Sequence, residues 1–227
     1  MSARVLVTGP SRGIGRAVAQ LAAQRGAEVL LLGRSSNALA ELQAELTRAG
    51  RTARIFSCDL GQRAQVDAAL EQLTHLDPPD LIVHNAGIVT RARVVDQDDA
   101  FWDETFEVNL TAPMRITRAL LPAMLERGQG RVVFVSSISA TLGSVAQGAY
   151  NASKAGMVAF MRCLAEELSD TSLMTCALLP GAVDTDMLKG SPFAARMTPQ
   201  EVAQAALYYG LDAPRAFNGA ALEMFGI

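Results

Sequence analysis

Hydrophobic and polar positions follow two alternating patterns along the chain. Short continuous apolar runs, typical of strands buried on both faces, predict strands at Arg4–Val7, Glu28–Leu32, Ala53–Ser57, Asp80–Val83, Arg131–Ser136, Leu173–Leu179 and Ala220–Met224. Apolar residues at helical spacing predict helices at Ile14–Arg25, Ala38–Ala49, Gln62–Leu73, near Asp98–Glu126, and at Ala149–Leu168 and Pro199–Tyr208. Because strands and helices alternate, we expect one α/β domain over residues 1–227, with a doubly wound, seven-stranded parallel sheet flanked by helices on both faces.

Composition narrows the class of protein. The chain is 50% hydrophobic and 19% charged, which leaves enough apolar material for a core and excludes a disordered chain. A net charge of −3 offers no positive field for phosphate backbones, so we expect no nucleic-acid partner. No apolar run is long enough for a membrane span, and the first strand follows the start too closely for a signal peptide. The separated cysteines Cys58, Cys163 and Cys176 predict no disulfide framework and no metal site, which favours the cytoplasm.

A glycine-rich turn follows the first predicted strand and precedes the first predicted helix. Its sequence is Thr8-Gly9-Pro10-Ser11-Arg12-Gly13-Ile14-Gly15. Such a turn presents backbone N–H groups and the positive end of a helix dipole to a phosphate. The glycines allow close approach of a pyrophosphate, which a Cβ would block. The spacing departs from the common dinucleotide fingerprint, so on this motif alone an ordinary glycine-rich loop stays open.

Tyr150 and Lys154 are the strongest candidates for chemistry. They stand four residues apart in a predicted helix, so their side chains share one face about one turn apart. A free phenol has a pKa of about 10, too high for efficient proton exchange at neutral pH. A neighbouring ammonium favours the phenolate, and we therefore expect a lowered pKa for Tyr150 and a role as general acid and base.

These motifs, with Asn85-Ala86-Gly87 after an apolar strand, resemble the short-chain dehydrogenase/reductase family in its single-domain form, and particularly 3-oxoacyl-(acyl-carrier-protein) reductases. The resemblance implies a Rossmann-type fold and an enzyme that interconverts a carbonyl and a secondary alcohol by hydride transfer, with Tyr150 exchanging the proton. It selects Ser137 over its neighbour Ser136 as the residue that polarises the substrate oxygen. It also implies that the backbone of Asn109 holds a water on a proton path.

The predicted cofactor is NADP(H). Dinucleotide folds that prefer NAD usually carry an acidic residue about 20 residues after the glycine loop. This chain has Arg34 there, and Arg12 inside the loop, and two guanidinium groups suit a 2′-phosphate. The resemblance places Asp59 near the adenine, although Asp59 could equally cap the next helix. The cofactor-binding candidates are Gly9, Ser11, Arg12, Gly13, Ile14, Gly15, Arg34, Asp59, Leu60, Asn85, Ala86, Gly87, Tyr150, Lys154, Pro180, Gly181, Val183 and Thr185.

The resemblance weakens after Pro180-Gly181. The family usually has a mobile lid there, and residues 182–198 form a short one. Arg127 and Arg131 could attract an acidic carrier protein, whereas the acidic pair Glu166 and Glu167 would repel it, so the substrate stays open.

Partners and alternatives also follow from the resemblance. It implies a homodimer or homotetramer acting on a small molecule. A non-catalytic protein that senses NADP(H) on the same fold is the alternative, while epimerases and dehydratases of the extended branch need a further substrate domain.

Overall fold

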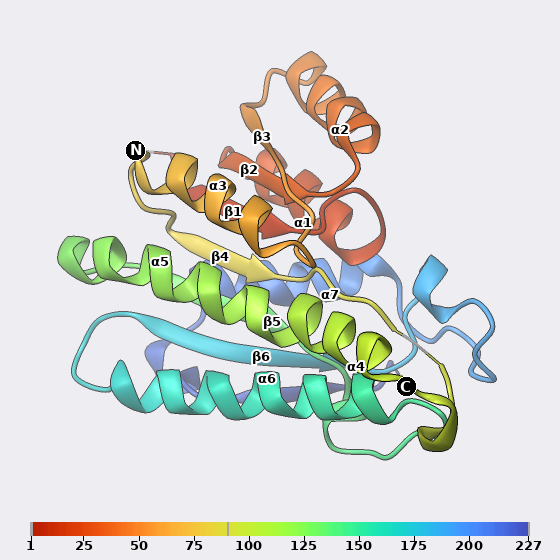
Figure 1. Cartoon of the computed structure of the whole chain (residues 1–227). Helices are drawn as coiled ribbons and strands as arrows, with labels where there is room; N and C mark the ends of the chain where they lie inside the picture. The colour runs from red at the N-terminus through yellow and green to blue at the C-terminus, as the bar shows by residue number, and fades with distance from the viewer. Residues whose placement is uncertain (1, 90, 227) are drawn as a thin grey trace.

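The computed structural model describes residues 2–89 and 91–226, and its strands form one parallel sheet (Figure 1). The sheet order is β3-β2-β1-β4-β5-β6-β7, and every neighbouring pair is parallel. This confirms the predicted Rossmann-type sheet, and each predicted strand matches within a residue at either end. The strands are β1 Arg4–Thr8, β2 Glu28–Gly33, β3 Ala53–Ser57, β4 Leu81–His84, β5 Arg131–Val135, β6 Met174–Pro180 and β7 Ala221–Met224.

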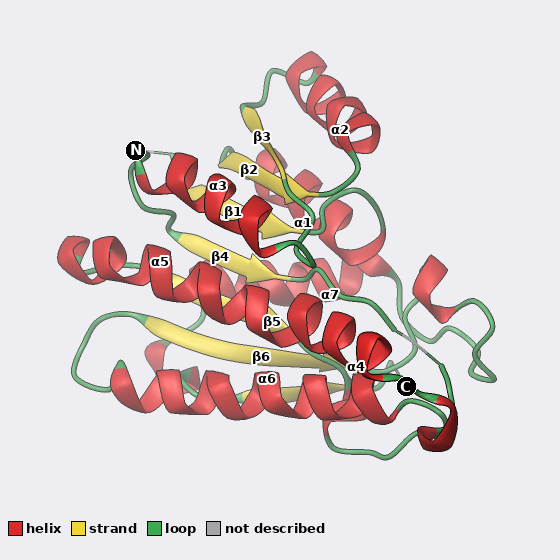
Figure 2. Ribbon diagram, in the orientation of Figure 1, coloured by secondary structure: helices red, strands yellow, loops and turns green. Residues whose placement is uncertain are grey.

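Helices cover both faces of the sheet, as Figures 1 and 2 show: α3, α5 and α6 lie on one face, and α1, α2 and α7 on the other. The α-helices are α1 Gly13–Gln24, α2 Ser36–Arg48, α3 Arg63–Thr74, α4 Asp99–Phe106, α5 Ala112–Arg127, α6 Gly148–Glu167 and α7 Pro199–Leu207. Short 3₁₀ or π segments are η1 Val94–Asp96, η2 Glu107–Thr111, η3 Ile138–Ala140, η4 Asp186–Leu188, η5 Tyr208–Asp212 and η6 Arg215–Phe217.

Two apolar cores, one on each face, hold these layers together. Successive side chains of a strand point to opposite faces. In β1, Val5 and Val7 therefore pack toward α1 and α7, and Leu6 packs toward α5 and α6. All three are fully buried. The helices of each layer are thus fixed to strands whose carboxyl ends carry the candidate residues.

The chain reverses its direction of travel across the sheet between β1 and β4. These two strands are neighbours, with Val7 paired to Val83, although many residues separate them in sequence. Ligands of doubly wound folds bind at such a switch point, outside the carboxyl ends of the strands. The glycine loop after β1 and the Asn85-Ala86-Gly87 turn after β4 meet there.

The predicted long helix near Asp98–Glu126 is interrupted. The π-helical turn η2 separates α4 from α5, and the N–H of Ala112 donates to the carbonyl of Glu107, five residues back. Pro113 provides the physical reason, because an α-helix needs the N–H of residue 113 to pair with the carbonyl of Asn109, and proline has none. Such π turns often occur at functional sites.

Candidate active site

The glycine loop is built around backbone contacts that exclude side chains. A Cβ on Gly15 would lie 2.3 Å from the carbonyl oxygen of Gly9, and Gly9 itself has a φ of +66°. No described side chain caps the start of α1, where Arg12 is the N-cap residue. The first N–H groups of α1 are therefore available at the loop, and the dipole of α1 gives this end a partial positive charge.

Asn85 fastens the glycine loop to the end of β4. Its Nδ2 donates to the carbonyl oxygens of Thr8 at 3.0 Å and Gly9 at 3.2 Å. In return, Thr8 Oγ1 accepts from the backbone N–H groups of Asn85 and Ala86, both at 3.0 Å. The two motifs predicted from the sequence are thus one hydrogen-bonded unit.

Both arginines predicted to hold a 2′-phosphate are exposed. The side chains of Arg12 and Arg34 are 75% and 72% accessible, so neither is committed to packing. Arg12 Nη1 lies 3.4 Å from Asp186 Oδ2, and Arg34 Nη1 lies 3.9 Å from Asp59 Oδ2. Exposed pairs of this kind contribute little to stability, so the guanidinium groups can exchange these carboxylates for a phosphate at low cost.

Asp59 does not cap α3. The N-cap of that helix is Gln62, and the Asp59 carboxylate accepts from the N–H of Gly61 at 3.1 Å. Leu60 is buried in the core beneath the turn. Asp59 thus remains on the same edge as the glycine loop, beside Arg34.

The end of β5 separates two neighbouring serines. Ser136 Oγ donates to the carbonyl oxygen of Lys154 at 3.0 Å, which ties the strand to α6. Ser137 Oγ accepts from the N–H of Ser139 at 3.1 Å, and its hydroxyl interacts with Tyr150, where it lowers the pKa of the phenol. The pleat therefore points Ser137, and not Ser136, at the tyrosine hydroxyl.

The surroundings of Tyr150 act on its pKa in opposite directions. Burial has the largest effect and raises the pKa, while the hydrogen bond with Ser137 and the charge of Arg91 lower it. The net result is a raised pKa. The chain's own groups do not produce the lowered pKa predicted from the sequence, because burial disfavours the phenolate more than Ser137 and Arg91 favour it.

Lys154 is buried beside the tyrosine ring. Its Nζ lies 5.9 Å from the centroid of the Tyr150 ring and donates to the carbonyl oxygen of Val135 at 3.1 Å. Burial lowers the pKa of Lys154 to about 8, so the side chain is still protonated in most molecules at neutral pH. An ammonium is therefore held next to the phenol.

Asn109 is fully buried in the π turn and links three segments. Its side chain accepts from the N–H of Ile88 at 2.8 Å and donates to the carbonyl of Ile88 at 2.9 Å and to Ser153 Oγ at 3.0 Å. The side chain is thus used for positioning. Pro113 leaves the carbonyl of Asn109 without its α-helical donor, so this oxygen can accept a hydrogen bond from water.

The turn after β6 comes back to the glycine loop. A Cβ on Gly13 would lie 3.2 Å from Thr185 Cγ2. Gly181 donates its N–H to the carbonyl of Met224 at 2.8 Å, and Val183 forms an isolated bridge with Met197. That bridge closes the base of the segment 182–198.

The two arginines considered for a carrier protein are used inside the chain. Arg127 donates to the carbonyls of Pro78 and Pro79, and Arg131 donates to those of Tyr209 and Ala213. These contacts lie at the amino ends of β4 and β5, away from the candidate site. Arg127 and Arg131 are therefore used in contacts within the chain, which does not support the suggestion that they attract an acidic carrier protein.

Sequence reasoning missed two features beside the tyrosine. Arg91 lies in the loop after β4, and no motif singles it out. Ala146 adopts a φ of +61°, which is rare for a residue with a side chain, and its carbonyl accepts from the N–H of Ala92 at 2.9 Å. Only the fold brings these loops together.

Within residues 2–89 and 91–226, no group of three His, Cys, Asp or Glu side chains is arranged to hold a metal ion. Across the same residues, no helix combines the length and the apolar character needed to cross a membrane.

The fold and the loop at its switch point define a doubly wound protein of the dinucleotide-binding type, and comparison with known proteins gives the family. Residues 3–193 match the family model described as short chain dehydrogenase. The 3-oxoacyl-(acyl-carrier-protein) reductase of Escherichia coli (strain K12) is 32% identical over 185 residues, covering 81% of this chain and 75% of that protein. The chain therefore belongs to the short-chain dehydrogenase/reductase family of oxidoreductases.

Solved structures agree with this assignment. A putative NAD(P)-dependent gluconate 5-dehydrogenase from Beutenbergia cavernae, crystallised with NADP, superposes with a TM-score of 0.92 at 30% identity, over 99% of this chain and 95% of that chain. A 3-oxoacyl-(acyl-carrier-protein) reductase from Brucella melitensis with bound NAD gives a TM-score of 0.89 at 31% identity, over 99% and 90%.

Proposed function

We propose that the protein is an NADPH-dependent oxidoreductase that interconverts a carbonyl and a secondary alcohol, with Tyr150 as the general acid and base. One observation carries the proposal: the Lys154 ammonium is buried 5.9 Å from the Tyr150 ring centroid, and Ser137 acts on the pKa of the same phenol. A non-catalytic protein has no need to bury an ammonium beside a phenol at this edge of the sheet.

The chain has a cradle of the right kind for the cofactor. The close approach of Gly15 to Gly9 keeps the loop free of side chains, and the uncapped start of α1 offers N–H donors to a pyrophosphate. Arg12 and Arg34 would hold the 2′-phosphate, since no carboxylate stands at the end of β2 to accept from a ribose hydroxyl. This favours NADP(H) here, although the Brucella melitensis relative was crystallised with NAD.

The four proposed catalytic residues have separate roles. Bound NADPH supplies the hydride, and its oxidised ring carries a positive charge that favours the Tyr150 phenolate. As the carbonyl carbon is reduced, Tyr150 gives its proton to the oxygen, and Ser137 donates a hydrogen bond to the same oxygen. Lys154 keeps a positive charge next to the phenolate, and Asn109 offers a carbonyl through which water returns the proton.

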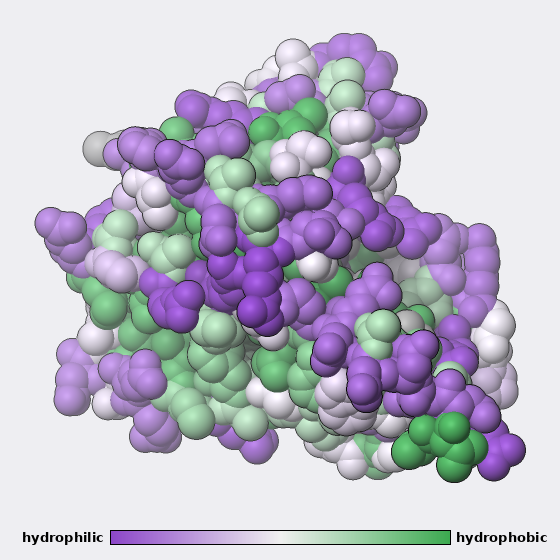
Figure 3. Space-filling view, viewed as in Figure 1, coloured by the Kyte–Doolittle hydropathy of each residue, from purple (hydrophilic) through white to green (hydrophobic). Residues whose placement is uncertain are grey.

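The remaining expectations belong to the same proposal. Residues 1–227 act as one domain, in the cytoplasm, with residues 182–198 as a short lid over the substrate. The chain forms a homodimer or homotetramer. Figure 3 shows apolar surface over α5 and α6, and Leu125 of α5 is 40% exposed. Light scattering of the purified protein measures that state directly.

Oxidation of NADPH and of NADH, measured separately against 3-oxoacyl thioesters, cyclic ketones, quinones and aldehydes, tests the proposed function. We expect turnover with NADPH as the better cofactor. Tyr150→Phe removes only the hydroxyl and should lower kcat by about 100-fold or more, the usual size of a lost proton transfer. Ser137→Ala should lower kcat as well.

Tyr208→Phe is the matched control, because Tyr208 is exposed in η5 near the amino ends of the strands. It should retain wild-type rates. Equal rates in wild type and Tyr150→Phe would contradict the assignment of Tyr150. Tight NADPH binding with no turnover of any carbonyl would favour the sensing protein instead.

A further inference from the structure

Arg91 lies between two hydrogen-bonded residues of a loop next to the proposed active site. It lies in the loop after β4, and both sides of that loop are anchored. On one side, the N–H of Ile88 donates to Asn109 Oδ1 at 2.8 Å. On the other, the N–H of Ala92 donates to the carbonyl of Ala146 at 2.9 Å, four residues before Tyr150. The backbone of Arg91 is therefore positioned by the same segments that carry the proposed catalytic groups.

The guanidinium of Arg91 spans the gap between this loop and the segment 182–198. Its Nη2 donates to the carbonyl oxygen of Met187, in η4, at 3.2 Å. Its positive charge also acts on Tyr150, where it favours the phenolate. The bond to Met187 and the anchor of Ala92 on Ala146 thus place the guanidinium between the segment 182–198 and the loop that leads into Tyr150, where a substrate of the phenol would lie.

The charge of Arg91 has no balancing carboxylate among the residues that the structure describes. Among the described residues no carboxylate lies within ion-pair distance of it, whereas Arg12, Arg34 and Lys189 on the same edge each have one. The hydrogen bond to the Met187 carbonyl uses one of the five N–H donors of the guanidinium. The side chain is exposed, so the guanidinium can pair with a ligand.

We propose that Arg91 recognises the substrate, and that the substrate of this enzyme carries an anionic group, a carboxylate or a phosphate, close to the carbonyl that is reduced. Guanidinium pairs with both groups through charge-assisted, often bidentate hydrogen bonds. This inference rests on the proposed function, since it names the substrate class of the same site. It assigns Arg91 to the substrate and not to the pyrophosphate of the cofactor.

Two pairs of carbonyl compounds, each with one charged and one neutral member, separate the effect of the anionic group from that of the carbonyl. We would measure NADPH oxidation with 3-oxobutanoate and its methyl ester, and with dihydroxyacetone phosphate and dihydroxyacetone. We expect the wild type to prefer one or both of the charged partners. Arg91→Ala should lower kcat/KM for that partner by about 10- to 100-fold, mainly through KM, and leave the neutral partner within about 3-fold. Arg91→Lys should recover part of the loss, because it keeps the charge without the planar fork.

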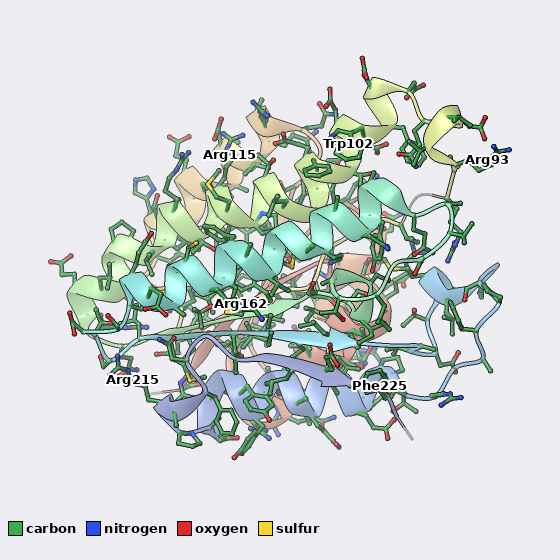
Figure 4. All side chains as sticks on the ribbon, turned by 90° about the horizontal axis from the view of Figure 1, so that it is seen from below. Arg93, Trp102, Arg115, Arg162, Arg215 and Phe225 are labelled. Atoms are coloured by element: carbon green, nitrogen blue, oxygen red, sulfur yellow. The ribbon has the colours of Figure 1, made fainter. Side chains whose placement is uncertain are left out.

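Arg93→Ala is the matched control. Figure 4 shows Arg93 at the outer edge of the molecule, pointing away from the sheet, two residues along the same loop. It should retain wild-type constants with every substrate. The affinity of each variant for NADPH, measured by fluorescence titration, should stay within about 2-fold of wild type. A loss of NADPH affinity in Arg91→Ala would assign the guanidinium to the cofactor and overturn the proposal.

Binding without turnover gives an independent readout. Calorimetric titration of each carbonyl into protein loaded with NADP⁺, which has no hydride to give, should show tighter binding of a charged partner in wild type and loss of that preference in Arg91→Ala. The pH at which alcohol oxidation reaches half its maximum should also rise in Arg91→Ala, because a charge that favours the phenolate is gone. Ser137 and Lys154, the other groups facing the phenol, are unchanged in this variant.

Failure of this inference can be told from failure of the proposed function. Equal binding of charged and neutral partners by wild type, or equal losses for both in Arg91→Ala, would overturn the role of Arg91 while leaving carbonyl reduction intact. Absence of turnover with every carbonyl, with Tyr150→Phe indistinguishable from wild type, would remove the proposed function itself. Thermal unfolding midpoints of all variants exclude misfolding as a cause.

Discussion

Gly15 shows how one missing side chain shapes the candidate cofactor site. A Cβ at this position would meet the backbone of Gly9 and also the side-chain amide of Asn85, at 2.4 Å. Backbone cannot move away as a flexible side chain can. Glycine is therefore required here because two loops are in contact at this position. It also keeps the proposed pyrophosphate site free of a side chain.

Gly15→Ala should consequently disturb the loop and the junction with β4 together. We expect it to lower the free energy of unfolding by about 2 kcal/mol or more, the range for overpacking, and to weaken NADPH binding by at least about 10-fold. Urea unfolding and fluorescence titration measure the two effects.

Gly143→Ala serves as the control, because a Cβ at Gly143 would meet no atom within 4 Å. It should leave both quantities close to wild type. An unchanged NADPH affinity in Gly15→Ala would show that the loop does not approach the cofactor through this glycine.

At the scale of elements, the end of β5 assigns different tasks to adjacent serines. Ser136 is buried and bonds the backbone of α6, whereas Ser137 reaches the phenol of Tyr150 from the same turn. The two residues carry the same hydroxyl group and differ only in the direction in which the extended backbone points it. One joins two elements, and the other belongs to the site that they form.

Ser136→Ala should therefore affect stability and not chemistry. Loss of one buried hydrogen bond should lower the free energy of unfolding by about 1 kcal/mol, with kcat close to wild type. Ser137→Ala should show the reverse pattern. Denaturant unfolding and steady-state kinetics on both variants make the comparison, and a larger kcat loss in Ser136→Ala would reverse the assignment.

The π turn between α4 and α5 is another feature of element scale. Pro113 prevents an unbroken α-helix at the position where Asn109 must lie against Ile88 and Ser153. The proline was visible in the sequence as a signal for this interruption, since it lies four residues after the asparagine. Helical periodicity alone continued through it and predicted a single long helix.

At the scale of the whole molecule, a buried histidine connects the sheet to the helix layer. His84 is fully buried at the end of β4, and its ring stacks on Phe134. Thr117 Oγ1 donates to the carbonyl of Pro113, so it must accept at 2.9 Å from the Nε2–H of His84, which defines the tautomer. Burial lowers the pKa of His84 from 6.5 to about 3.

This burial predicts a pH dependence of stability. A histidine with a depressed pKa binds its proton in the unfolded chain before it does so in the folded chain, so acid favours unfolding. The contribution of His84 should be complete above about pH 6.5 and fall by about 1.4 kcal/mol per pH unit as the pH decreases toward about 3. Urea unfolding at several pH values gives the slope.

His84→Asn should reduce that slope below pH 6.5 whatever its effect on stability at neutral pH. His75→Asn is the control, because His75 is exposed at the end of α3, and it should keep the wild-type slope. An identical slope in His84→Asn and wild type would mean that His84 does not resist protonation in the folded state.

The sequence by itself determined the sheet and its helices, apart from the π turn that divides α4 from α5, and it indicated most candidate residues of the site. The periodicity of apolar residues and the glycines of the first turn act over a few neighbouring positions, where geometry follows directly from residue type. The spacing of Tyr150 and Lys154 is of the same local kind. These features can be predicted without knowing which segments pack against them.

Only the tertiary structure decided the charges and contacts around the phenol. The direction of the Tyr150 pKa depends on how completely α6 is covered, and the placement of Arg91 depends on loops that meet after β4, β5 and β6. The internal use of Arg127 and Arg131 has the same origin. Burial and long-range electrostatics arise between segments that are far apart in the chain, and no pattern among neighbouring residues encodes them.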